Sequence, residues 1–342
     1  MGRPGVVVST LFASGPPELP ALRRAHARAA VHAVRTPLVR LPARDGEREV
    51  WLKLETLQPI GSFKIRGAAN ALALVPAERL ARGVFTASAG NMAQGVAWVA
   101  RAHGVPCTVL VPDSAPAAKL DAVSRLGARL VPLPFARWWQ VLEEHRYPGL
   151  EGVFVHPVSD EGVIMGNAGV GLEIREDLPA PGAVLVPFGG GGLACGIATA
   201  LRASGSQAAV FACEVETAAP LAASFAAGSP QRIERVPSFV DGIGAGALLP
   251  EMWPLARTWL AGSCVVSLAQ IADAVRALVS RARVVAEGAG ASSLAAALGS
   301  QAAVASSGTR VELPDGPLVC VISGGNLDPA RLAEMLLGHV PD

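Results

Sequence analysis

The chain has 342 residues, of which 51% are hydrophobic and 17% are charged. This composition excludes an intrinsically disordered protein, and the length predicts two lobes with sizeable hydrophobic cores. The 29 Lys and Arg residues nearly balance the 28 Asp and Glu residues, so neither a nucleic-acid-binding surface nor a basic membrane-binding helix is expected.

Cysteine usage indicates the redox environment. The five cysteines are Cys107, Cys195, Cys213, Cys264 and Cys320, and most of them lie within apolar runs. No two of them have Cys-x-x-Cys spacing. Buried, reduced thiols in a cytoplasmic protein are therefore expected.

The N-terminal part predicts a helix, a strand and a second helix. An alanine-rich, arginine-studded pattern predicts an amphipathic helix over residues 18–34, and apolar alternation predicts a strand over residues 50–55. After a turn, a helix is predicted over residues 63–74, with Ser62 as its N-cap. Lys64 would therefore lie in the first helical turn.

From residue 84 onward, short apolar runs alternate with helical patterns. The predicted strands are residues 84–88, 107–111, 129–133 and 153–158, and the helices between them end near residues 103, 126 and 147. Such alternation is typical of parallel strands joined by helices. We expect residues 81–157 to form the smaller of two lobes.

The same alternation continues toward the C-terminus. Further strands are predicted over residues 183–187, 209–215, 264–268 and 318–323, and helices over residues 162–177, 218–227, 269–281, 290–298 and 329–337, with another ending at residue 203. Residues 288–308 carry no charge and predict a buried helix, too weakly apolar for a membrane span. Residues 230–250 are rich in Pro and Gly and predict a loop. We expect residues 1–80 and 158–342 to form the larger lobe, which shares one cleft with the smaller.

One lysine lies among apolar and small residues, in the run Ile60-Gly61-Ser62-Phe63-Lys64-Ile65-Arg66-Gly67. Because burial disfavours a charged ammonium, such a lysine is paired, extends its head to water, or serves as an amine nucleophile. For a lone lysine the solvated helix face would be the better interpretation. The other motifs of the chain favour the nucleophile.

Four consecutive glycines, Gly189–Gly192, lie between a predicted strand and a predicted helix. Backbone N–H groups at such a helix N-terminus favour a phosphate. The same residues, with Ala194 in the third position and Glu214 about 20 residues further on, also fit the dinucleotide fingerprint of a nicotinamide or flavin oxidoreductase. A purely structural turn is the third interpretation.

Two further turns follow predicted strands. Ser88-Ala89-Gly90-Asn91 presents backbone N–H groups, a hydroxyl and an amide toward the expected cleft, although by itself it also fits a capped helix start. Ser323-Gly324-Gly325-Asn326 places a hydroxyl after the last predicted strand, although by itself it fits a flexible loop equally well.

The segment from Leu52 to Asn70 resembles the lysine motif of the threonine/serine dehydratase family, and the other motifs occur in that family's order. The resemblance covers residues 36–326. It implies the two-lobed α/β fold of the fold-type II pyridoxal-phosphate enzymes, similar to the tryptophan synthase β subunit, in which each lobe is a mainly parallel sheet flanked by helices. It also implies that Lys64 binds pyridoxal 5'-phosphate as a Schiff base.

The resemblance further implies a role for each motif. The cofactor would be held by Gly189, Gly190, Gly191, Gly192 and Leu193 at its phosphate end, by Ser323 at the pyridine nitrogen, by Asn91 at the ring hydroxyl, and by Phe63, Gly242 and Glu287 around the ring. The substrate would be bound by Ser88, Ala89, Gly90 and Asn91. A helix-capping role accounts for Glu287 almost as well.

Several positions depart from the family pattern. Ala89 stands where serine racemases of this fold have a serine that delivers a proton, so elimination is expected rather than racemisation. Met92 and residues 165–169 leave the identity of the substrate open. Glu214 matches one acidic ligand of a cation site in some relatives, but Pro220 replaces the second, so no metal is expected.

We therefore expect β-elimination of a β-hydroxy amino acid such as L-threonine or L-serine to a 2-oxo acid and ammonia, with Lys64 as the base at Cα. The alternatives are a racemase or a β-replacement synthase of the same fold, or a dehydratase of another β-hydroxy amino acid. We expect the protein to form a homo-oligomer, either a dimer or a tetramer. Its substrate would be a small molecule, and no nucleic-acid or membrane partner is expected.

Overall fold

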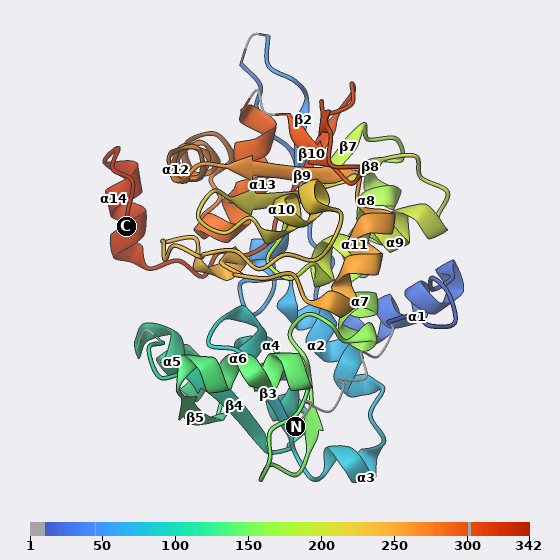
Figure 1. Ribbon diagram of the computed structural model, residues 1–342, viewed down its shortest axis with the longest axis vertical. Helices are drawn as coiled ribbons and strands as arrows, with labels where there is room; N and C mark the ends of the chain where they lie inside the picture. Colours follow the sequence, from blue (N-terminus) through green and yellow to red (C-terminus); the bar gives the residue numbers. More distant parts are fainter. Residues whose placement is uncertain (1–10, 45, 116, 300–301) are drawn as a thin grey trace.

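The computed structural model describes residues 11–44, 46–115, 117–299 and 302–342. The first ten residues, which were predicted to belong to the larger lobe, lie outside this part. Figure 1 shows two α/β regions along the long axis of the molecule, with an eight-stranded sheet in one and a four-stranded sheet in the other.

The larger sheet has the strand order β1-β2-β12-β7-β8-β9-β10-β11. Its strands are β1 (Leu38–Arg40), β2 (Val50–Leu54), β7 (Ala183–Pro187), β8 (Ala209–Val215), β9 (Gly262–Val266), β10 (Ala303–Ala305), β11 (Arg310–Val311) and β12 (Leu318–Ile322). The strands from β2 to β9 in this order are parallel, whereas β1, β10 and β11 pair antiparallel with their neighbours. All residues of β12 are buried, as is typical of a parallel strand covered on both faces.

The smaller sheet has the order β5-β4-β3-β6 and is parallel throughout. Its strands are β3 (Val84–Ala87), β4 (Cys107–Pro112), β5 (Arg129–Leu133) and β6 (Val153–Phe154), and its helices are α4 (Asn91–Ala102), α5 (Ala117–Ser124) and α6 (Phe135–Glu144). These mainly parallel sheets with flanking helices confirm the predicted fold class. The strands of the smaller sheet lie inside the range predicted for the smaller lobe, whose boundaries stay a prediction.

Of the remaining helices, α3 packs with the smaller region, and most of the others cover the larger sheet or connect the two regions. They are α1 (Leu19–Ala29), α2 (Lys64–Ala73), α3 (Ala77–Leu80), α7 (Glu161–Asn167), α8 (Gly169–Asp177), α9 (Gly192–Ala203), α10 (Pro220–Ala227), α11 (Trp253–Trp259), α12 (Leu268–Ala277), α13 (Gly288–Leu298) and α14 (Pro329–Leu336). Short helical turns are η1 (Glu55–Leu57), η2 (Asp241–Ile243), η3 (Pro250–Met252) and the π-helix η4 (Leu278–Ala282). Alternate residues of β12 belong to two hydrophobic clusters, Cys320 to the one with α12 and α13 and Val321 to the one with α9, because successive side chains point to opposite faces.

A buried ionic network fixes the start of α2. Arg66 is 1% exposed, and its guanidinium binds the Glu55 carboxylate over 2.8 Å and the Glu173 carboxylate over 2.7 Å. Lys53 Nζ, also buried, donates to Glu173 over 2.5 Å. Because Arg66 follows Lys64 by two residues, this network joins α2 to β2, η1 and α8 beside the predicted lysine.

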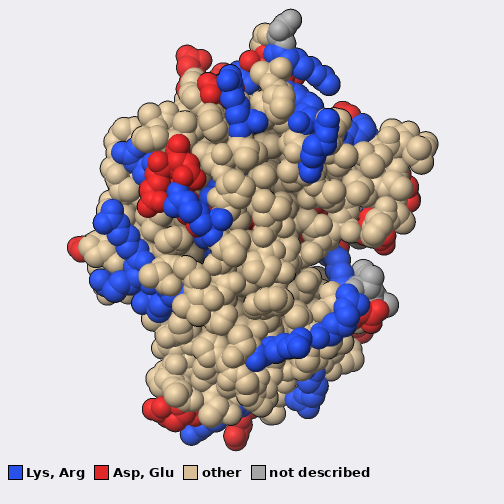
Figure 2. Space-filling model, turned by 180° about the vertical axis from the view of Figure 1, so that it is seen from behind, with Lys and Arg blue, Asp and Glu red and all other residues tan. Residues whose placement is uncertain are grey.

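The surface and the cysteines agree with a compact protein. On the face in Figure 2, charged side chains of the described residues form small groups separated by wide uncharged areas, rather than one basic band. All five cysteines are free and buried, which confirms the expected burial of the thiols. Within the described ranges, no helix has the length and apolar character needed to cross a membrane.

The structure corrects several predicted elements near the site. Ser62 does not cap α2, since it is buried and its backbone pairs with Gly324. The strand predicted over residues 153–158 ends at Phe154, because Pro157 has no N–H group and the His156 ring accepts the amides of Val158 and Ser159.

Two predicted helices are also wrong in extent. The helix predicted over residues 162–177 divides into α7 and α8 at Ala168. The glycines of the two halves pack against different helices. A Cβ at Gly166 would collide with α2, and a Cβ at Gly169 would collide with His26 of α1. The buried helix predicted over residues 288–308 ends at Leu298, and β10 pairs with β9 instead.

Candidate active site

A cavity of about 590 Å³ lies where the turns after β3, β7 and β12 meet. Crevices beyond the carboxyl ends of parallel strands are the usual ligand sites of such sheets. All the predicted site residues line this cavity: Phe63, Lys64, Ser88, Ala89, Gly90, Asn91, Gly189, Gly190, Gly191, Gly192, Leu193, Gly242, Glu287 and Ser323. The fold thus brings together motifs that are up to 260 residues apart in the chain.

Lys64 is the first residue of α2 and is half-buried. Its Nζ donates a hydrogen bond to the Pro157 carbonyl over 2.9 Å and lies 5.1 Å from the centre of the Phe63 ring. Burial lowers the pKa of Lys64 to about 8, although the Glu287 carboxylate acts in the opposite direction. Near neutral pH, an appreciable fraction of this amine is therefore neutral and nucleophilic.

The loop Gly189–Gly192 ends at the N-terminus of α9, where backbone N–H groups have no intrahelical acceptors. Gly191 adopts φ +99°, in the left-handed region that favours glycine. A Cβ at Gly190 would lie 2.6 Å from the methyl carbons of Val158. Only glycine therefore fits these two positions, and the loop forms a cradle of backbone donors that suits a phosphate.

Asn91 begins α4 and connects two other motifs of the cavity. Its Nδ2 donates to Glu287 Oε1 over 2.8 Å, and its Oδ1 accepts from Asn326 Nδ2 over 2.7 Å. In the same turn, Ser88 Oγ accepts the Gly90 amide over 3.3 Å. The N-cap Gly90 makes no side-chain cap, so the turn is not the side-chain-capped helix start that the sequence alone also allowed.

Glu287 stands at the N-cap position of α13, but its side chain makes no capping hydrogen bond. Its carboxyl group faces the cavity and accepts from Asn91, so the helix-capping interpretation is wrong. Burial raises the pKa of Glu287 to about 7, and the Asp241 carboxylate adds to this effect.

Ser323 and Gly242 also line the cavity. Ser323 follows β12 and is 4% exposed, and its carbonyl accepts the Phe63 amide over 3.0 Å. Gly242 lies in η2, where a Cβ would stand 2.8 Å from the Cβ of Ala289. A larger side chain at Gly242 would therefore collide with α13 or project into the cavity.

The donor set fits pyridoxal phosphate. The glycine cradle suits the phosphate, the Lys64 amine suits the aldehyde, and the Phe63 ring offers a flat apolar neighbour. Asn91 and Ser323 supply an amide and a hydroxyl for the polar atoms of a pyridine ring.

An aromatic wall of the cavity was not predicted. Phe135, Trp138 and Trp139 of α6 line it, and the Arg232 guanidinium lies 5.7 Å from the centre of the Trp139 ring. Paired tryptophans were visible in the sequence, but the helical pattern assigns them equally well to core packing. The contact between Trp139 and Arg232, about 90 residues further along the chain, cannot be predicted from the local sequence around either residue.

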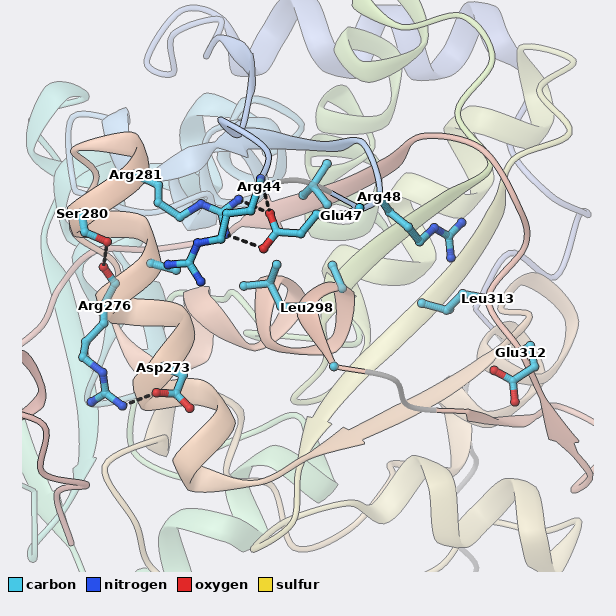
Figure 3. A pocket seen from close by; sticks show the side chains of 15 residues that line it. Arg44, Glu47, Arg48, Asp273, Arg276, Ser280, Arg281, Leu298, Glu312 and Leu313 are labelled. Carbon is cyan, nitrogen blue, oxygen red and sulfur yellow. Dashed lines mark hydrogen bonds and ion pairs between the residues drawn. The ribbon is translucent and has the colours of Figure 1, made fainter.

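A second cavity of about 670 Å³ lies away from these motifs, and Figure 3 shows its side chains. Arg281 donates to the Pro42 carbonyl over 2.5 Å and pairs with Glu47, while Arg276 pairs with Asp273. Arg48 donates to the Gly316 carbonyl over 3.1 Å. Arg281 thus connects residues 42–47 to η4, Arg48 connects to the segment before β12, and Arg276 pairs within α12, so these guanidinium groups have a structural use.

Glu214 makes no metal site in this structure. Its carboxylate accepts the amides of Leu221 and Ala222 over 2.8 Å and the Ser263 hydroxyl over 2.6 Å. Across the described ranges, no three His, Cys, Asp or Glu side chains gather in a way that would hold a metal ion.

Comparison with known proteins identifies the family. The family model described as "Pyridoxal-phosphate dependent enzyme" matches residues 30–324. An L-threonine ammonia-lyase from Thermotoga maritima is 37% identical over 286 residues, which cover 82% of this chain and 68% of that protein.

Solved structures give the same result. A threonine deaminase from T.th. superposes with a TM-score of 0.80 at 33% identity, covering 91% of this chain and 99% of that one. Maize serine racemase also has a TM-score of 0.80, at 30% identity, covering 95% and 98%. The chain is therefore a pyridoxal-phosphate dependent enzyme and belongs to the threonine dehydratase family.

Proposed function

We propose that this enzyme is an ammonia-lyase that converts L-threonine or L-serine to the corresponding 2-oxo acid and ammonia. The observation that carries the proposal is the meeting of Lys64, the glycine cradle, Asn91 and Ser323 in one cavity. The ammonia-lyase and deaminase names of the similar proteins support the same reaction.

The residues of the four motifs have different tasks in this reaction. Pyridoxal phosphate, when bound, supplies an electron-withdrawing ring that stabilises negative charge at the substrate Cα. Gly189–Gly192 would hold its phosphate, and the Ser323 hydroxyl would meet its ring nitrogen. Ser88, Gly90 and Asn91 bind the substrate carboxylate through backbone N–H groups and polar side chains.

The Lys64 amine removes the Cα proton, because its lowered pKa leaves it partly neutral at physiological pH. The β-hydroxyl then leaves as water with the proton that Lys64 took from Cα. The resulting unsaturated amine is hydrolysed by water, which gives the 2-oxo acid and ammonia. Ala89 has no hydroxyl to return a proton to Cα, so elimination is favoured over racemisation.

The test is 2-oxo acid release from a panel of L- and D-β-hydroxy amino acids by the cofactor-loaded protein, with Lys64→Ala as the control. We expect release from L-threonine or L-serine, and at least a thousandfold loss in Lys64→Ala, on the order seen when a catalytic group is removed. Conversion of L-serine to D-serine without 2-oxo acid would instead support the racemase, and normal turnover by Lys64→Ala would contradict the proposal.

We further propose three properties of the whole protein: its division into domains, its location in the cell and its oligomeric state. Residues 81–157 would form the smaller of two domains, which is supported by the separate four-stranded sheet. The enzyme would act in the cytoplasm, which is supported by five free, buried thiols. It would form a homo-oligomer, as expected from the sequence.

A further inference from the structure

Asn326 lies in the loop after β12, which packs against the loop that precedes Lys64. The Gly325 amide donates to the Gly61 carbonyl over 2.8 Å. Gly61 adopts φ +70°, and a Cβ there would lie 2.7 Å from Asn326 Oδ1. The Asn326 side chain is therefore closely packed on one side, although much of the residue is exposed.

The hydrogen bonds of Asn326 form a chain whose direction is fixed at its Ile60 end. Asn326 Nδ2 donates to the Ile60 carbonyl over 2.9 Å, and a carbonyl oxygen can only accept. The same Nδ2 donates to Asn91 Oδ1 over 2.7 Å, which leaves Asn91 Nδ2 to donate to Glu287 over 2.8 Å. The Ile60 carbonyl therefore sets one orientation for both amides, in which the Glu287 oxygen accepts.

We propose that Asn326 is a positioning residue that fixes the amide of Asn91, with its oxygen turned away from Glu287 and its nitrogen toward Glu287. This inference rests on the proposed cofactor-binding role of Asn91. An asparagine amide can otherwise rotate by half a turn and exchange its donor for its acceptor. The direction set at Ile60 thus decides that Asn91 offers an N–H group, rather than a carbonyl oxygen, on the Glu287 side of the site.

The experiment measures the dissociation constant of pyridoxal phosphate from the apoprotein, by titration of its fluorescence. Asn326→Asp keeps the shape but replaces the donor by an acceptor, and Asn326→Ala removes the group. We expect the dissociation constant to rise about fivefold in Asn326→Ala, because one hydrogen bond to Asn91 is lost. In Asn326→Asp we expect a rise of about tenfold or more, because the new carboxylate oxygen faces the Ile60 and Asn91 oxygens and is repelled by them.

The matched control is Asp328→Ala, in the same loop. Asp328 Oδ1 accepts the Ala330 amide over 2.9 Å and caps α14, so its loss lowers Tm without involving Asn91. We expect its dissociation constant to stay within about twofold of wild type. If Asp328→Ala and Asn326→Ala raised the dissociation constant equally, general packing of the loop would explain the effect of Asn326. That result would overturn the proposal.

A double variant tests the transmission through Asn91. In Asn326→Asp with Glu287→Gln, the Asn91 amide can turn over, donate to Asp and accept from Gln. We expect the double variant to recover more Tm than the sum of the two single losses predicts, because coupled sites are not additive. Its cofactor binding should stay weak, because the carbonyl oxygen of Asn91 then lies on the side of residue 287. Strict additivity of the losses in Tm, wild-type cofactor binding by the double variant, or wild-type binding by both Asn326 variants would refute the proposal.

Binding of the cofactor does not depend on which amino acid is the substrate. If no member of the amino-acid panel yields a 2-oxo acid while the Asn326 variants still bind weakly, only the proposed reaction fails. If the panel reacts as expected and the Asn326 variants bind normally, only the positioning role fails.

Discussion

At the scale of single residues, the environment of Lys64 predicts how the protein captures its cofactor. The neutral amine attacks the aldehyde, and burial lowers the pKa of Lys64 to about 8. At pH 7.5 about a quarter of this amine is neutral, compared with about 0.1% for an ordinary lysine. The rate of reconstitution of the apoprotein should therefore rise about tenfold per pH unit below pH 7 and level off above about pH 8. A rate that still rises tenfold per unit at pH 9 would contradict this pKa, and Lys64→Arg should show no such profile.

The glycine loop gives a second prediction at this scale. Gly190 has no positive φ, so the only obstacle to alanine is Val158, whereas Gly191 has φ +99°. We expect Gly190→Ala to weaken pyridoxal-phosphate binding at least about fivefold through overpacking. Val158→Ala should restore binding in Gly190→Ala but not in Gly191→Ala, where the backbone itself is strained. The same titration measures cofactor binding in these variants. If Val158→Ala restored binding in both glycine variants or in neither, this distinction would be contradicted.

At the scale of elements, the ionic network should hold the first turn of α2. Arg66→Met leaves the buried carboxylate of Glu55 without an ionic partner and leaves Glu173 with Lys53 alone, so we expect a loss of about 3 kcal/mol in the free energy of unfolding. Urea unfolding measures this loss. The control is Arg35→Gln, whose pair with Glu176 is exposed and should contribute less than about 1 kcal/mol. Similar losses in both variants would show that burial does not decide the strength of these pairs.

The elements also show what the sequence alone could predict. The strand ends and the turns of the four motifs carry local signals, such as consecutive glycines after an apolar run, and all of them meet in the cavity. The break between α7 and α8 depends on which neighbouring helix each glycine approaches, and the end of β6 depends on a histidine that accepts backbone amides. Asn326 was visible within its motif, but its contact with Asn91 appears only when residues 91 and 326 are brought together.

At the scale of the whole molecule, the cavity has two walls of different origin. The glycine cradle and Ser323 come from turns of the larger sheet, whereas Phe135, Trp138 and Trp139 come from α6 beside the smaller sheet. The first wall carries groups suited to the cofactor. The second carries large side chains suited to bounding the substrate.

This division predicts that substrate choice can change without loss of the cofactor. Trp139 is half-buried in the wall, so Trp139→Ala enlarges the cavity on the side of α6. We expect the ratio of kcat/KM for a bulky β-hydroxy amino acid, such as β-phenylserine, to that for L-threonine to rise about tenfold, since pocket contacts of this size contribute about 1–3 kcal/mol. The dissociation constant of pyridoxal phosphate should stay within about twofold. Trp259→Phe, which alters a tryptophan packed against Phe12 rather than one that lines the cavity, is the control. A Trp139→Ala protein that loses the cofactor but keeps its substrate preference would show that α6 supports cofactor binding instead.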